Sequence, residues 1–194
     1  MGRWRTQKCS FPYRTTRAGI KIFLRPVRSD DEELVRSFAK TLSEQDIYFR
    51  FFRHVEPNED FLKRFVNIDP NEGIAVLALV RREKADKIVG GDRFFIDRER
   101  RIAEVVITVG SEYQNKGIGR EVLLHLISLA RAEGFKGLTA QVLADNVAML
   151  RLLRSLEGVE YDMQRSLDAG VFHMDMVFIG REPQEARPGD STDT

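Results

Sequence analysis

Gln114-Asn115-Lys116-Gly117-Ile118-Gly119 is the stretch that decides the fold. An apolar, alternating segment at residues 102–109 precedes it, and an amphipathic segment at residues 118–133 follows it. We predict a strand, a tight turn and a helix, because two glycines allow a close turn and helical apolar spacing follows. The first N–H groups of such a helix lack intrahelical partners and lie at the positive end of its dipole. The turn is therefore a candidate site for an anion such as a phosphate.

Two glycines alone are also compatible with a turn that merely needs glycine. The stretch is not G-x-x-x-x-G-K-[ST], and it lacks the first glycine of G-x-G-x-x-G, so it fits neither nucleotide motif. Lys116 and Arg120 add positive charge at the same end of the helix. This charge favours the anion site.

The amino-acid composition limits the classes of protein to which the chain can belong. A chain of 194 residues, 42% hydrophobic and 31% charged, is typical of one soluble globular domain. A net charge of +1 gives no field that would favour nucleic acid or an anionic membrane, and the longest apolar run, 74–80, is too short to cross a bilayer. Cys9 is the single cysteine, which fits a reducing, cytoplasmic location. His54, His125 and His173 lack ligand spacing, so we expect no metal site.

The two ends of the chain differ from its middle. Residues 1–19 are basic and contain no acid, which is also a property of organelle transit peptides. Trp4, Phe11 and Tyr13 argue against a transit peptide, so we expect a partly ordered basic arm. Proline, glycine and charge dominate residues 181–194, which we expect to be a disordered tail. Residues 20–180 form the predicted domain.

Periodicity and turn residues predict an α+β protein with a mixed, mostly antiparallel sheet of about seven strands flanked by helices. The strands 74–81, 87–96 and 102–109 have the spacing of an antiparallel meander, whereas 102–109 and 138–143 flank a helix and should be parallel. The remaining strands are expected at 20–27, 159–166 and 171–179. Helices are expected to begin at Ser29–Glu32, Ser43, Pro57, Ile118, and Asp145 or Asn146.

Two motifs in this framework resemble a known family. Gln114, Gly117 and Gly119 match Q/R-x-x-G-x-G, the acyl-CoA pyrophosphate loop of the GNAT N-acetyltransferases. Residues 42–52 read LSEQDIYFRFF, which is similar to a signature of the GNAT domain in bacterial Pat-type protein lysine acetyltransferases. The alternative is that Phe49, Phe51 and Phe52 are only core aromatics. The element order over residues 20–179 also resembles the GNAT fold, in which the fourth and fifth strands are parallel and splayed.

The resemblance implies that the chain is an enzyme with acetyl-CoA as co-substrate. Backbone N–H groups of the loop would hold the pyrophosphate, and main-chain groups of the preceding strand would pair with the pantetheine arm between the splayed strands. The asparagine that opens the next helix would contact the same arm. The implied site comprises Ile107, Val109, Gln114, Asn115, Lys116, Gly117, Ile118, Gly119, Arg120 and Asn146, without a metal.

Glu104 is the candidate catalytic residue. It interrupts an apolar strand, shares a face with Val106 and Thr108, and matches the position of the catalytic glutamate in Pat-type domains. A lysine amine has a reference pKa of ~10.4 and must lose a proton before it attacks a thioester. A backbone N–H near Val109 would stabilise the oxyanion. The alternative is that Glu104 is an exposed residue or the partner of an arginine.

The chain departs from the family at two places. Many GNAT enzymes have a tyrosine acid seven positions after the asparagine, where this chain has Leu153. Pat-type domains also lack that tyrosine. The segment Ser155-Leu156-Glu157-Gly158-Val159 replaces a family motif and is one residue longer, which leaves the geometry after this helix open.

The resemblance thus predicts acetyl transfer to a lysine side chain of a protein, and the candidate partner is an acyl-CoA synthetase. The alternatives are a GNAT enzyme that acts on a small-molecule amine, and a non-catalytic acyl-CoA-binding module that would not need Glu104. We expect no nucleic-acid partner, no membrane association, and a monomer or homodimer.

Overall fold

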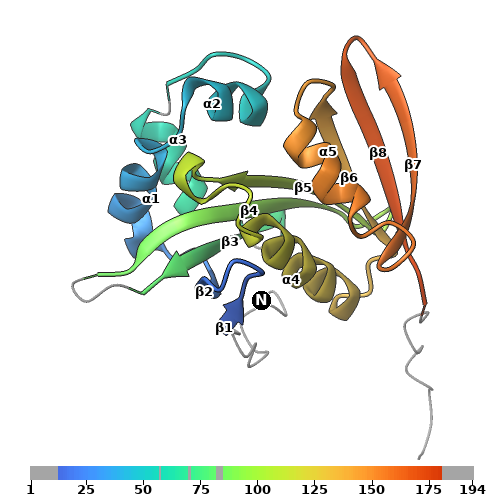
Figure 1. The fold of residues 1–194 in the computed structure, drawn as a ribbon, viewed down its shortest axis with the longest axis horizontal. Coiled ribbons are helices and arrows are strands. Elements are labelled where there is room, and N and C mark those ends of the chain that lie inside the picture. Colours follow the sequence, from blue (N-terminus) through green and yellow to red (C-terminus); the bar gives the residue numbers. More distant parts are fainter. Residues whose placement is uncertain (1–12, 57, 70, 82–84, 181–194) are drawn as a thin grey trace, which may run out of the picture.

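A computed structural model describes residues 13–56, 58–69, 71–81 and 85–180 (Figure 1). It contains one eight-stranded sheet in the order β1-β2-β3-β4-β5-β6-β8-β7. All neighbouring strands are antiparallel except β5 and β6, which are parallel. The predicted α+β class, the central meander and the single parallel pair are confirmed.

The first part of the chain forms two edge strands and three short helices. Strands β1 (Tyr13–Thr15) and β2 (Lys21–Pro26) are followed by a 3₁₀ turn, η2 (Ser29–Asp31), and by α1 (Glu32–Ala39). Helix α2 (Glu44–Phe51) begins where Ser43 accepts a hydrogen bond from the Asp46 N–H, and α3 (Glu59–Val66) begins where Asn58 accepts one from Phe61. These caps satisfy N–H groups that a helix start leaves unpaired.

The rest of the chain supplies the centre of the sheet and its far edge. The meander consists of β3 (Gly73–Val80), β4 (Lys87–Asp97) and β5 (Ile102–Val109), and a 3₁₀ turn, η3 (Ser111–Tyr113), leads to the glycine loop. Then follow α4 (Ile118–Ala132), β6 (Gly137–Leu143), α5 (Val147–Arg154), β7 (Tyr161–Asp168) and β8 (Val171–Phe178).

Alternation along the strands separates two apolar cores. In β2 and β3, Ile22 and Val76 belong to the core that contains α4, whereas Leu77 and Leu79 belong to the core of α1 and α3. Val76 and Leu77 are successive residues of β3 and lie in different cores, because successive side chains of a strand point to opposite faces. Helix α4 therefore covers one face of the central strands, and α1 and α3 cover the other.

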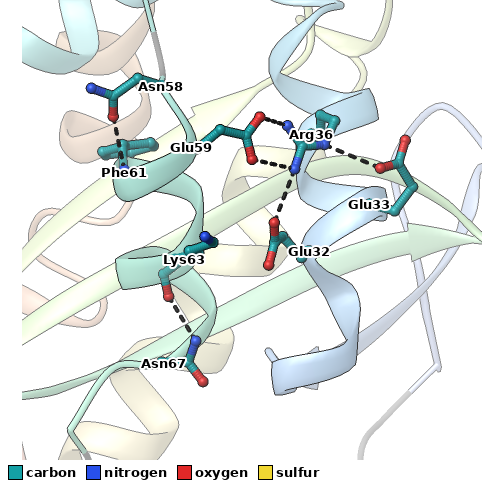
Figure 2. Close-up of polar contacts among 8 residues, drawn as sticks. All are labelled: Glu32, Glu33, Arg36, Asn58, Glu59, Phe61, Lys63 and Asn67. Carbon is teal, nitrogen blue, oxygen red and sulfur yellow. Dashed lines mark hydrogen bonds and ion pairs between the residues drawn. The ribbon is translucent and has the colours of Figure 1, made fainter.

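Ion pairs hold the short helices in place. Arg25 of β2 and Asp31 of η2 are both buried and share two hydrogen bonds of 2.6 Å. At the surface, Arg36 of α1 contacts Glu32 and Glu33 of its own helix and Glu59 of α3 (Figure 2). The buried pair orients the start of α1 on the sheet, while the exposed pairs contribute less because water screens them.

Three details of the expected elements differ from the structure. The sheet has eight strands, because residues of the basic arm pair with β2 as the extra strand β1. Ser29 does not cap a helix with its side chain; the Asp31 carboxylate accepts from the Arg28 N–H instead, and α1 starts later. Strand β7 starts at Tyr161 rather than at 159, after a turn with Gly158 at φ 72°. Pro57 and the expectations for residues 1–12 and 181–194 lie outside the described residues.

Strands β5 and β6 stay together over only three residue pairs. Ile102, Ala103 and Glu104 face Gly137, Leu138 and Thr139, and no pair follows Glu104 in this register. Figure 1 shows β6, β8 and β7 turning away from the central strands beyond this point. The predicted splay between the parallel strands is confirmed, and it begins at Glu104.

Candidate functional site

A groove of about 590 Å³ opens at the carboxyl end of β5. Its walls come from β5, the glycine loop, and the helices α2, α4 and α5. The structure brings together all ten residues of the predicted cofactor site along this groove: Ile107, Val109, Gln114, Asn115, Lys116, Gly117, Ile118, Gly119, Arg120 and Asn146. Glu104 is not among the lining residues.

The glycine loop presents a run of N–H groups without protein acceptors. Within the described part of the chain, no carbonyl or side chain accepts from the N–H groups of residues 115–120, and the ladder of α4 starts with Glu121 on Gly117. Asn115 and Gly117 have φ values of 57° and 86°, which turn successive amides toward one side. The arrangement fits a bound pyrophosphate.

The two glycines also leave little room for side chains. A Cβ on Gly117 would lie 3.3 Å from the backbone nitrogen of Arg17, and one on Gly119 would lie 3.2 Å from a methyl group of Leu152. The loop is therefore closely packed behind the surface that it presents to the groove.

Positive charge surrounds this surface. Arg17, Arg50, Lys116, Arg120 and Arg151 line the groove, and Asp46 is the single acidic residue among its lining. Such an excess of cations favours a ligand that carries several phosphates. The electrostatics of the groove thus agree with coenzyme A.

Asp46 connects α2 to the loop. One carboxylate oxygen accepts from the Ser111 hydroxyl at 2.5 Å and from the Ser43 N–H at 3.0 Å, and the other accepts from the Gln114 amide at 2.6 Å. Burial acts to raise the pKa of Asp46, but the hydrogen bonds from Ser111, Ser43 and Gln114 outweigh it and hold the pKa below its ordinary value. The carboxylate therefore remains ionised and holds the loop against α2.

This contact also fixes the role of the Gln114 side chain. Its amide nitrogen donates to Asp46 and, at 3.1 Å, to the carbonyl of Val109. The amide thus positions the loop on the end of β5, at the edge of the groove that Gln114 lines.

The backbone of β5 faces the gap left by β6. The Arg101 carbonyl accepts from Lys136 next to β6, whereas the Gly110 N–H donates to Val89 of β4. Since alternate residues of a strand direct their polar groups to the same neighbour, Ile107 and Val109 direct theirs toward the splayed side. Asn146 lies across the groove, where its side chain caps α5 by accepting from the Met149 N–H at 3.1 Å.

Glu104 is half-buried at the point where the splay begins. It shares a face with Val106 and Thr108, because Ala103 and Val105 are buried in the opposite core. Among the described residues, no ion pair or side-chain hydrogen bond involves Glu104. The structure thus does not show the arginine partner that the structural alternative requires.

A tyrosine acid is absent from the expected position. Leu153 is fully buried, and its carbonyl accepts a hydrogen bond of 2.6 Å from the Tyr161 hydroxyl. Burial raises the pKa of Tyr161 above its ordinary value, and Glu157 adds to this effect. Tyr161 is therefore a structural residue.

Sequence reasoning missed several residues of the groove: Arg17, Arg50, Asp46, Thr108 and Arg151. The spacing of Ser43 and Asp46 is a capping-box signal, and the capping box is present, but its second role toward the loop depends on tertiary contacts. Arg17 reaches the loop because the arm folds back along β2, which its composition did not predict.

The described residues offer neither a cluster of metal ligands nor a membrane-spanning helix. They contain no group of three or more His, Cys, Asp or Glu side chains placed to hold a metal ion. None of their helices combines the length and apolar character needed to cross a bilayer.

Comparisons of sequence relate the chain to known proteins. It matches the acetyltransferase (GNAT) family over residues 38–157. A Pseudomonas aeruginosa protein named as an acetyltransferase is 31% identical over 139 residues, which are 71% of this chain and 75% of that protein. Acetyltransferase Pat of Mycolicibacterium smegmatis is 31% identical over 145 residues, which are 74% of this chain but only 43% of Pat.

Solved structures agree on the fold. The GNAT domain of S. lividans PAT has a TM-score of 0.76 at 23% identity, with 86% of this chain and 96% of that domain covered. A GNAT superfamily phosphinothricin acetyltransferase from Sinorhizobium meliloti, in complex with AcCoA, has a TM-score of 0.62 at 22% identity, with 88% and 97% covered. The predicted GNAT fold is confirmed.

Proposed function

Because this chain belongs to the acetyltransferase (GNAT) family, whose co-substrate is acetyl-CoA, we propose that it acetylates the side-chain amine of a lysine on a protein. Its sequence relatives include Pat, and its residues 42–52 carry the Pat-type signature. The chain spans less than half of Pat, so the activity of the whole Pat protein does not transfer by similarity. We further propose that the acceptor is a folded acyl-CoA synthetase and that the enzyme works in the cytoplasm as a monomer or homodimer.

The observation that carries the proposal is the contact between the signature, residues 42–52, and the glycine loop, residues 114–119. Asp46 and Ser43 belong to the signature. Asp46 accepts hydrogen bonds from Ser111 and Gln114 beside the loop, and Ser43 caps α2 by accepting from the Asp46 N–H. The same helix contributes Phe49 and Arg50 to the groove. The signature is thus part of the wall of the groove, and we expect the acceptor lysine to enter beside it.

The protein residues have separable tasks. Bound acetyl-CoA supplies an acetyl thioester that an amine can attack. The N–H groups of residues 115–120 hold the pyrophosphate, and the backbone of Ile107 and Val109 binds the pantetheine arm along β5. Glu104 takes the proton of the incoming ammonium group, directly or through water, because a lysine amine with a reference pKa of ~10.4 arrives charged near neutral pH.

An acceptor survey tests the proposal. Purified enzyme is incubated with acetyl-CoA and, separately, with folded acyl-CoA synthetases, free lysine, polyamines and aminoglycosides, and product is measured by mass spectrometry. We expect site-specific acetylation of a lysine in a folded protein, with a higher kcat/KM than for any free amine. Efficient acetylation of a small amine, with no protein acetylated, would overturn the proposal in favour of a small-molecule acceptor.

A further inference from the structure

We propose that a cavity beside the groove binds an acidic side chain close to the target lysine of the acceptor protein. This inference rests on the proposed function, because it concerns the acceptor of the same reaction. The cavity has a volume of about 410 Å³ and lies among α2, α3 and β4. Arg53, Arg64 and Arg93 line it together with one acid, Glu56. Its net charge favours an anion.

Arg93 is the central residue of this cavity. It is half-buried, and its guanidinium lies over the rings of Phe95 and Phe65, 4.9 and 5.9 Å from their centres. Its Nε is shielded from solvent and has no hydrogen-bond partner, and within the described ranges no carboxylate pairs with it. A half-buried cation without a carboxylate partner is costly, and an incoming carboxylate would compensate its charge.

The aromatic contacts hold the guanidinium in one orientation. A planar guanidinium presents a pair of parallel N–H groups that matches the two oxygens of a carboxylate. Burial lowers the pKa of Arg93 from its ordinary value, and Glu72 opposes the shift only through its charge. The geometry and the environment therefore describe a cation whose partner comes from outside the described chain.

The sheet register places Arg93 beside the catalytic candidate. Arg93 lies opposite Val106 and Phe95 lies opposite Glu104, so Arg93 and Glu104 are diagonal neighbours on one face. Diagonal positions on adjacent strands are roughly 7–8 Å apart at their Cα atoms. An amine at Glu104 and an anion at Arg93 would thus belong to nearby parts of one acceptor.

A small apolar slot lies between the arginine cavity and the cofactor groove and shares lining residues with both. Phe51, Phe61 and Arg93 line both the cavity and the slot, and Arg50 and Thr108 line both the slot and the groove. The arginine cavity and the cofactor groove therefore adjoin the same slot, and under the proposal one acceptor would contact Arg93 while its lysine approaches the thioester. Because an extended peptide advances ~3.3 Å per residue, the acidic side chain would lie within about three positions of the lysine.

Matched peptides test the inference. Each peptide carries one lysine, flanked at the three positions on either side by glutamate or by glutamine, and kcat/KM is measured for wild type, Arg93→Met and Arg165→Met. We expect wild type to prefer the glutamate peptide by about tenfold or more, and Arg93→Met to bring the ratio close to one. Arg165 lies exposed on β7 and serves as the control, whose variant should keep the preference.

A second pair of acceptors separates this inference from the proposed function. 6-Aminohexanoate and its amide differ only in the carboxylate, and they need no protein recognition. If peptides are not acetylated but the enzyme prefers 6-aminohexanoate in an Arg93-dependent manner, the protein-lysine proposal fails and the carboxylate site stands. Equal rates for both members of each pair in wild type would overturn the carboxylate site. So would an unchanged preference in a folded Arg93→Met variant.

Discussion

Glu104 occupies the last residue pair that β5 shares with β6, so its backbone is held on both sides while its carboxylate is in no ion pair of the described structure. This combination suits a base, because the carboxylate is positioned but not neutralised. We predict that Glu104→Gln lowers kcat by about 10²–10⁴-fold, the usual contribution of a positioned base, and leaves the affinity for acetyl-CoA nearly unchanged. Melting temperature and kcat are to be measured on the same preparation.

Glu99→Gln is the matched control for this prediction. Glu99 is exposed in the turn between β4 and β5, and the same change there should leave both quantities as in wild type. A stable Glu104→Gln enzyme with wild-type turnover would refute the catalytic assignment.

Gly117 is the residue at which the proposed cofactor site can be tested most directly. Its φ of 86° is in the left-handed region, and a side chain there would meet the backbone of Arg17. We predict that Gly117→Asp abolishes binding of CoA, because it adds bulk and negative charge where the pyrophosphate lies. Isothermal titration with CoA measures the effect.

Gly170 provides a control with similar backbone strain. Its φ is 82°, and a Cβ there would meet no atom within 4 Å. Gly170→Asp should therefore bind CoA like wild type. Equal affinities of the two folded variants would remove the loop from the cofactor site.

At the scale of elements, Asp46 links α2 to the loop before α4 through the hydrogen bonds that it accepts from Ser111 and Gln114. We predict that Asp46→Ala lowers the free energy of unfolding by about 1–3 kcal/mol, because it removes the bond that the Asp46 carboxylate accepts in the capping box of α2 and the hydrogen bonds that it accepts from Ser111 and Gln114. It should also weaken CoA binding, since Gln114 loses an acceptor and the loop is less well held. Glu44→Ala, in the first turn of the same helix, is the control for charge alone.

The contribution of Asp46 should depend on pH in one direction. Its pKa is lower in the folded protein than its ordinary value of ~3.9, so the folded state favours the ionised form. The stabilisation is therefore present above about pH 4 and is lost as pH falls through the lower, folded pKa. Melting curves of wild type and Asp46→Ala should differ at pH 6–7 and converge in acid. A difference that grows in acid would contradict the assignment.

A helix or strand can be predicted from sequence when the pattern that indicates it lies within one short stretch. Strand β5 and the start of α4 were predicted at their observed residues, because alternation, a glycine turn and helical spacing all occur within one short stretch. Strand β1 was missed because three residues at a sheet edge have no periodicity to detect, and their pairing with β2 is a tertiary contact. Asp46 and Arg93 have their partners or neighbours on distant segments, so their roles depend on a register that sequence alone does not provide.

At the scale of the whole molecule, the groove that we propose for acetyl-CoA is lined by parts that are distant in sequence, from Arg17 to Ser155. A ligand that binds only the folded chain stabilises it by mass action, which amounts to ~2.7 kcal/mol at a hundredfold excess over Kd. We predict a corresponding rise in melting temperature with acetyl-CoA. The rise should be absent in Gly117→Asp, and an equal rise in that variant would indicate binding elsewhere.

The short pairing of β5 with β6 gives the sheet a seam, with β1 to β5 on one side and β6, β8 and β7 on the other. To open, the smaller block must break the backbone bonds of only three residue pairs, together with the apolar contacts of β6 and β8 in the core around α4, so it is suited to open as a cooperative unit of its own. Native-state hydrogen exchange should then show amides of β6, β7 and β8 opening together, at a lower free energy than those of β3 and β4. Acetyl-CoA would lie across the seam, and its binding should raise that opening free energy toward the global value.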